Sequence, residues 1–313
     1  MQSSQNYVST TRRRLSWPAF LKWAAGFLLV IFLLDYGICA FLDMGLRRYF
    51  GLDKAVQVVC VGHSRTILGI DEALLGRVLG VTAAKFAVNG ANTVDRAAMV
   101  RYVLKQQPGM KILVYDVEES SFAGEGLSAN SYRLFFPLID DPGMAAYLKG
   151  QCKSLGEYWL RKIWRTSRYD EVTLSLSMRG WFRVVENLKL QKFDPALTRR
   201  AVEKGRSRPV TVDAASYRTF LDMIAFAKAR GVKVVLVNMP TVDILNRIDM
   251  EKREQVRDLF RKLAKDDPHV VFLDYSRAFE TRYDLFYDTI HMNAKGQRVV
   301  TEDLAKHLKG ILQ

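Results

Sequence analysis

Cysteine is scarce in this chain, with only three among 313 residues. Cys39, Cys60 and Cys152 lie far apart and show no zinc-ligand spacing, which argues against a disulfide framework or a structural zinc site. The sequence also lacks the G-x-G-x-x-G and G-x-x-x-x-G-K-[ST] patterns of dinucleotide and phosphate-binding loops. We therefore predict neither a metal nor a cofactor.

Acidic residues are outnumbered, with 33 Asp and Glu against 47 Lys and Arg, so the formal net charge is +14. Much of the excess lies between Lys149 and Arg208, where fifteen basic residues face six acidic ones. Such an excess bears on partners and solubility rather than on the fold.

An apolar stretch from Trp17 to Leu42 follows the arginine cluster at 12–14. A membrane-spanning helix needs about 20 apolar residues. This stretch supplies them if Lys22 snorkels and Asp35 is tolerated. Because basic flanks stay in the cytoplasm, the arginines predict an uncleaved signal anchor with the rest of the chain across the membrane.

Two other interpretations of this stretch are weaker. A cleaved signal peptide would need a small-x-small site, which is not evident after the apolar core. A buried amphipathic helix would suit Asp35 but leaves the unbroken apolar run Phe27–Leu34 unexplained. We expect a cytoplasmic tail at 1–16, a transmembrane anchor at 17–42 and a folded domain at 47–313. The protein would then be single-pass in a bacterial inner (cytoplasmic) membrane, with its domain on the periplasmic or extracellular side.

The remaining chain alternates apolar runs with helical patterns. Strands are expected at 55–61, 84–89, 111–117, 233–240 and 270–276, with helices at 71–80, 93–107, 214–230, 250–266 and 294–312. Continuous apolar strands separated by amphipathic helices predict an α/β, three-layer fold with a five-stranded parallel, flavodoxin-like sheet. Ligands of such sheets bind at the carboxyl ends of the strands.

Residues 118–210 interrupt this alternation as a basic helical insertion. It contains Trp159, Trp164 and Trp181, three of the five tryptophans. We favour a helical cap with these aromatics in its core and its charges in solvent. The alternative is a basic, aromatic surface for an anionic glycan or lipid headgroups. Nucleic acid would suit the composition, but it does not suit the compartment that the anchor implies.

Chemistry-bearing residues occur at the two ends of the domain. "VVCVGHSRT" at 58–66 ends an apolar strand on a turn that presents Ser64, and "DTIHMN" places Asp288 three residues before His291. A serine nucleophile needs a base to take its proton, and a carboxylate to orient that base. One loop with the D-x-x-H spacing can supply both groups.

Together these motifs resemble the SGNH/GDSL hydrolase superfamily, especially its membrane-anchored branches that serve polysaccharide O-acetylation and teichoic-acid D-alanylation. The resemblance covers about residues 55–117 and 233–312 and not the insertion. It implies that Ser64 is the nucleophile, His291 the general base and Asp288 its orienting partner. The D-x-x-H-x-N-x-x-G run is fairly specific, whereas G-H-S alone is weak.

The chain departs from the family pattern in two motifs. His63 stands where the family has an Asp between Gly and Ser, and the third strand ends "YDVEESSF" without the usual Asn. For the oxyanion hole, the resemblance implies the N–H groups of Ser64 and Gly90. Asn89 or Asn92 is a candidate substitute for the missing side chain.

Further charged residues lie near these motifs. Arg65 directly follows the serine and is either a surface residue or a clamp for an anionic substrate. Asp116, Glu118 and Glu119 could join Asp288 at a hard metal ion, but such carboxylates are more often solvated edge charges.

Two functions follow. The first is an envelope-facing serine esterase or O-acyltransferase acting on an acylated cell-surface polysaccharide or a lipid-linked glycan. The second is a non-catalytic scaffold or glycan-binding component of an exopolysaccharide synthesis or export complex. The tether implies contact with the lipid bilayer and allows for a membrane-embedded partner subunit.

Overall fold

The computed structural model describes residues 16–123, 131–184, 189–190, 193–203 and 210–312. A single parallel sheet of five strands has the order β2-β1-β3-β4-β5. The strands are β1 (Val58–Gly62), β2 (Ala83–Ala87), β3 (Ile112–Val117), β4 (Lys233–Asn238) and β5 (Val270–Asp274). This topology confirms the predicted flavodoxin-like sheet.

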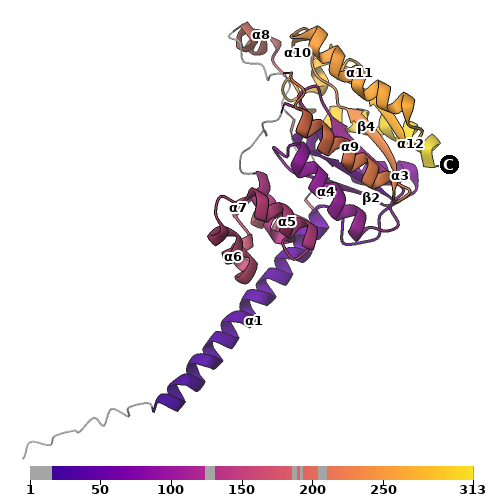
Figure 1. The fold of residues 1–313 in the computed structure, drawn as a ribbon. Helices are drawn as coiled ribbons and strands as arrows, with labels where there is room; N and C mark the ends of the chain where they lie inside the picture. Colours follow the sequence, from indigo (N-terminus) through magenta and orange to yellow (C-terminus); the bar gives the residue numbers. More distant parts are fainter. Residues whose placement is uncertain (1–15, 124–130, 185–188, 191–192, 204–209, 313) are drawn as a thin grey trace, which may run out of the picture.

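Helices cover both faces of the sheet, which accounts for the continuous apolar strands (Figure 1). Along β1, Val59 and Val61 join the core beneath α4, α9 and α11, whereas Val58 and Cys60 join the core beneath α3 and α12. The bounds are α3 (Glu72–Leu79), α4 (Thr93–Gln106), α9 (Ala214–Lys228), α11 (Met250–Asp266) and α12 (Ala294–Leu312). Shorter helices are α2 (Ser64–Gly69), α10 (Asp243–Asn246) and η3 (Tyr283–Leu285).

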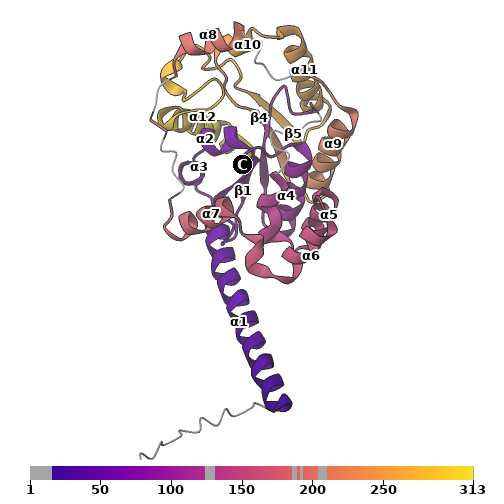
Figure 2. The same ribbon diagram turned by 90° about the vertical axis from the view of Figure 1, so that its left-hand side faces the viewer.

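Helix α1 (Trp17–Tyr49) projects from this domain (Figures 1 and 2). It is long and apolar enough to cross a membrane, and an 18-residue window within it has a mean hydropathy of 2.3. Most of its large side chains up to Leu34 are half or more exposed, and burial against the domain begins at Asp35. From Asp35 onward one face of α1 docks on the insertion, while Tyr36 and Ile38 on its other faces stay exposed. Residues 17–34, which precede these docked turns, are the free apolar part of α1.

The insertion consists of helices and loops, with no strand among its described residues. Its elements are η1 (Ser131–Leu138), α5 (Pro142–Gln151), α6 (Leu155–Ile163), η2 (Arg165–Arg168), α7 (Glu171–Trp181) and α8 (Pro195–Glu203). Its tryptophans do not form a core of their own, contrary to our expectation. Trp181 stacks on Phe41 of α1, Trp164 lies against Phe32 of α1, and Trp159 is 52% exposed.

Two interactions fix α1 to the insertion. The Asp35 carboxylate accepts hydrogen bonds from the backbone N–H groups of Arg165 and Thr166, both at 2.8 Å, and so caps the first turn of η2. Further along, α1 crosses α7 where Gly45 and Gly180 meet, and a Cβ at Gly180 would lie 1.8 Å from the Gly45 carbonyl oxygen. An acidic residue in an apolar helix is thus explained by docking.

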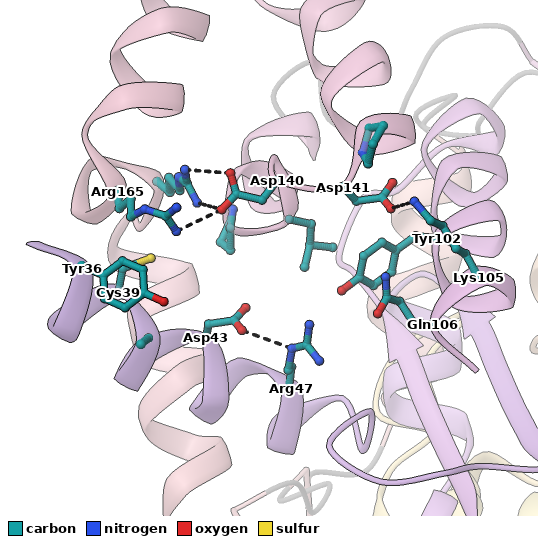
Figure 3. A pocket seen from close by; sticks show the side chains of 15 residues that line it. Tyr36, Cys39, Asp43, Arg47, Tyr102, Lys105, Gln106, Asp140, Asp141 and Arg165 are labelled. Carbon is teal, nitrogen blue, oxygen red and sulfur yellow. Dashed lines mark hydrogen bonds and ion pairs between the residues drawn. The ribbon is translucent and has the colours of Figure 1, made fainter. Parts of the chain in front are cut away.

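A polar pocket of about 440 Å³ lies where α1, α4 and the insertion meet (Figure 3). Its charged side chains pair with one another in three ion-pair groups. These are Arg47 with Asp43 at 3.1 Å, Lys105 with Asp141 at 2.6 Å, and Arg165 and Arg168 with Asp140 at 3.1 and 2.7 Å. The pocket lies toward the amino ends of the strands, since it includes the last turn of α4. Among these ion pairs, Lys105 with Asp141 joins α4 to the insertion, whereas the others lie within α1 or within the insertion.

Candidate active site

The turn after β1 presents Ser64 at the carboxyl edge of the sheet. Gly62 ends the strand in a space that admits no side chain, because a Cβ there would lie 1.8 Å from Thr66 Oγ1. His63 caps α2 by accepting the Arg65 backbone N–H at Nδ1, and Ser64 opens the helix with its side chain partly exposed. The sequence thus buries a strand and then turns sharply to expose a hydroxyl.

His291 and Asp288 lie in the loop between η3 and α12. An isolated bridge between Phe286 and Met292 closes this loop. Asn293 anchors its far end, since its amide donates to the Phe286 carbonyl at 3.2 Å and its Oδ1 accepts the Gly296 N–H at 3.0 Å. The D-x-x-H motif therefore lies in a loop that is held by the Phe286–Met292 bridge and by the hydrogen bonds of Asn293.

The structure brings the three predicted triad residues together. Ser64 Oγ lies 2.8 Å from His291 Nε2, and His291 Nδ1 lies 2.7 Å from Asp288 Oδ2. The other Asp288 oxygen accepts the backbone N–H groups of Ile290 and His291, both at 2.9 Å. With Nδ1 donating to the carboxylate, Nε2 is free to accept the serine proton.

Electrostatics keep the Asp288 carboxylate charged. Burial alone raises its pKa, but the hydrogen bond and charge of His291 and the backbone N–H groups of Ile290 and His291 outweigh burial. The pKa of Asp288 therefore lies below its ordinary value. The His291 side chain is 19% exposed, so the imidazole is accessible from solvent.

His63 is a buried neighbour of Ser64. Its Nδ1 lies 3.5 Å from Ser64 Oγ, and its Nε2 lies 3.6 Å from both Asp116 Oδ2 and Glu118 Oε1. Burial lowers the pKa of His63, and the two carboxylates only partly oppose this effect. Since Nδ1 accepts a backbone N–H, a neutral His63 carries its proton on Nε2, facing the carboxylates.

The oxyanion candidates lie on the loop after β2. Gly62 of β1 pairs in register with Ala87 of β2, so the Ser64 turn and the Gly90 turn start from adjacent positions. Gly90 has φ +74°, a left-handed conformation that favours glycine. Asn89 is exposed. Asn92 is already engaged, because its side chain caps α4 by accepting the Asp95 N–H at 2.9 Å.

Arg65 is neither a surface residue nor free to clamp a substrate. Its side chain is 1% exposed and donates to Glu118 Oε2 at 3.1 Å, to Asn238 Oδ1 at 3.3 Å and to the Met239 carbonyl. The Arg65 side chain points from α2 toward the ends of β3 and β4, which the sequence position alone did not indicate.

The carboxylates after β3 also differ from the expected edge charges. Glu119 is buried and pairs with Arg257 at 2.9 Å and Arg253 at 3.3 Å, both from α11. Asp116 accepts the Thr66 hydroxyl at 3.0 Å. The part of the chain that the structure describes holds no cluster of three or more metal-binding side chains.

Sequence reasoning missed Asn238, the last residue of β4. Its side chain is fully buried, accepting from Arg65 and donating to Glu119 Oε1 at 3.1 Å and Asp274 Oδ1 at 3.3 Å. The sequence did contain a signal for this residue, because it is a polar residue that ends an apolar strand, at the same edge of the sheet as Ser64. Asn238 links the turn that carries Ser64 to β5 through this hydrogen-bond network.

Comparisons with known proteins were made by sequence and by structure. No family model matches the sequence, and no curated protein matches it either. Among solved structures, the chain is similar to a GDSL-like lipase from Bacteroides thetaiotaomicron, with 10% identity, a TM-score of 0.43, and 87% of this chain and 100% of that chain covered. It is also similar to the C-terminal catalytic domain of peptidoglycan O-acetyltransferase A from Streptococcus pneumoniae, with 11% identity, a TM-score of 0.38, and 82% and 94% covered. At this level of similarity, the residues of the site itself have to carry a functional proposal.

Proposed function

We propose that this protein is a serine-dependent ester hydrolase or O-acyltransferase that uses Ser64, His291 and Asp288. The observation that carries the proposal is the continuous hydrogen-bonded chain from Ser64 through His291 to Asp288, with separations of 2.8 and 2.7 Å. Hydrogen-bond contact between nucleophile and base, with the base oriented by a third group, is the geometry of an activated serine.

In the first half-reaction, Ser64 Oγ bonds to the carbonyl carbon of an acyl ester while its proton moves to His291 Nε2. The negative oxygen of the tetrahedral intermediate would be held by the N–H groups of Ser64 and Gly90. When this intermediate collapses, the ester C–O bond breaks and the leaving alcohol takes the proton from His291. Asp288 stays ionised and stabilises the imidazolium between these transfers.

The second half-reaction regenerates Ser64. His291 removes a proton from water or from a sugar hydroxyl, which attacks the acyl-serine carbonyl, and Ser64 then leaves and regains its proton. Water gives hydrolysis, and a sugar hydroxyl gives O-acyl transfer.

Helix α1 suggests where the reaction takes place. We propose that its free apolar part spans the inner membrane, with Arg12–Arg14 in the cytoplasm and the domain on the envelope side. The substrate would then be an acylated cell-surface polysaccharide or a lipid-linked glycan. The basic insertion favours an anionic partner of this kind.

The test compares the full chain in detergent with its Ser64→Ala variant. A fluorophosphonate probe and a small activated acetyl ester are used in parallel. Ser175→Ala, at an exposed serine on α7, is the matched control. We expect labelling and turnover in the wild type and the control, and neither in Ser64→Ala. Equal behaviour of all three folded proteins would overturn the proposal and favour a non-catalytic scaffold.

A further inference from the structure

Helix α6 is amphipathic in the opposite sense to an ordinary surface helix. Tyr158 is buried, but the other large apolar side chains point to solvent, with Leu155 61%, Trp159 52%, Leu160 60% and Ile163 64% exposed. Its charged side chains Glu157 and Arg161 are only 15% and 18% exposed, and Arg161 lies over the Phe136 ring. A soluble domain has no reason to place four large apolar side chains of one short helix in water.

The position of α6 coincides with the end of the free part of α1. Figures 1 and 2 both show α6 at the end of the domain that faces the projecting length of α1. Trp164, which ends α6, lies 6.1 Å between ring centroids from Phe32, inside the exposed apolar part of α1. One turn further along α1, Arg165 lies over the Tyr36 ring. The two exposed apolar surfaces are therefore neighbours.

The placement of α6 relative to α1 is fixed rather than adjustable. Asp35 caps η2 directly after α6, and the Gly45–Gly180 crossing joins α1 to α7 on the other side of η2. Because α1 is held at these points, a bilayer around its free part has to meet the domain at the level of α6.

The composition of α6 and its flanks suits such a boundary. Tryptophan is favoured at the membrane–water interface, where one part of its ring is in an apolar environment and another is wet. Basic residues flank the apolar face at both ends, with Lys153 before the helix and Lys162 and Arg165 at its end. Lys162 and Arg165 also pair with Asp140 but stay 33% and 37% exposed. An interfacial helix combines an apolar face buried among acyl chains with basic groups near anionic headgroups.

We propose that α6 is an interfacial membrane helix, with Leu155, Trp159, Leu160 and Ile163 inserted in the same bilayer that α1 spans. The occupant of this exposed face is therefore lipid, not a second protein. The inference rests on the proposed anchoring by α1 and adds a second membrane contact to it.

Site-specific photo-crosslinking in the full chain tests this directly. p-Benzoylphenylalanine replaces Trp159 in one variant, Trp23 of α1 in a second and Met250 in a third. Met250 is the control, because it is 54% exposed like Trp159 but begins α11, away from α1 (Figure 1). Each variant that melts like the wild type is placed in nanodiscs of phosphatidylethanolamine and phosphatidylglycerol and irradiated. Adducts are identified by mass spectrometry.

We expect lipid adducts at positions 23 and 159 and none at 250. Lipid adducts at 23 without any at 159 overturn the interfacial role of α6 and leave the anchor intact. Crosslinks from 159 to a second copy of the chain, without lipid adducts there, overturn it in favour of a protein contact. Absence of lipid adducts at 23 refutes the anchor itself, and the present inference with it.

Discussion

Ser64 Oγ lies 2.8 Å from His291 Nε2, although 227 positions separate the two residues in the chain. The parallel topology produces this contact, since Ser64 follows β1 and the His291 loop follows the last strand, β5, at the same edge of the sheet. At this distance the serine proton can pass directly to the imidazole.

Asp288→Asn should preserve the loop shape and reduce turnover. The amide still accepts the N–H groups of Ile290 and His291, but it neither stabilises the imidazolium nor selects the tautomer that leaves Nε2 free. In serine proteases this change costs about 10⁴ in kcat, and we expect a loss of about 10²–10⁴ in ester turnover here. Asp284→Asn is the control, because Asp284 belongs to the same region but pairs with Arg282 and Lys295. Equal losses in both variants would show that the effect is not specific to the triad.

Arg65 should be needed for folding more than for the reaction. Arg65→Met leaves Glu118 without its buried guanidinium partner, and breaking a buried pair in this way costs about 3–5 kcal/mol of unfolding free energy. The double variant Arg65→Met/Glu118→Gln should recover part of that loss, because the side chain at position 118 then carries no buried charge. Chemical denaturation of the three proteins measures both effects. A single variant as stable as the wild type would contradict the assignment.

Gly180→Ala should weaken the docking of α1. The added Cβ would lie 1.8 Å from the Gly45 carbonyl oxygen, so α1 and α7 have to separate. Overpacking of this kind costs about 1–3 kcal/mol, which we expect as a lower melting temperature of the full chain. Gly150→Ala is the matched control, since a Cβ there meets nothing within 4 Å and alanine favours helix. It should leave the melting temperature unchanged or raise it.

Glu254 should make the stability of α11 sensitive to acid. Hydrogen bonds from Arg261 and Arg257 lower its pKa from 4.5 to about 2. Since the folded-state pKa is depressed, the contribution of Glu254 is complete above pH 4.5 and is lost as the pH falls toward 2. The melting-temperature difference between wild type and Glu254→Gln should therefore shrink over that range. A difference that stays constant with pH would rule out this ionisation as its source.

Most of the sheet could be predicted from the sequence because its pattern is local. Residues 58–61 and 112–115 are apolar on both faces, and the helix predicted at 93–107 differs from α4 by one residue. The pairing of Ser64 with His291 could also be predicted, since both follow strands that end at one edge. The role of Asn92 could not be predicted in the same way. Its position before a helix fits both an oxyanion donor and a helix cap, and the structure shows the cap.

What the sequence could not indicate depends on tertiary contacts. Arg65, Glu118 and Glu119 look like solvated charges, and only the packing of α2 and α11 against the strand ends buries them together. In the sequence, Asp35 only disfavours a membrane anchor. Its hydrogen-bond donors come from η2, which lies 130 residues later in the chain.

The docking of α1 also fixes the distance between its free apolar part and Ser64. The carbonyl of Phe50, directly after α1, accepts a hydrogen bond from the Lys85 N–H of β2. Ser64, in contrast, lies beyond the carboxyl end of β1. The docked turns of α1 from Asp35 and the length of one strand together measure at most about 40 Å. The proposed membrane span of α1 would therefore hold Ser64 at a fixed height, on the side of the domain that faces away from the bilayer. That arrangement would favour ester groups carried on an extended polymer over the glycerol esters of the surrounding lipids.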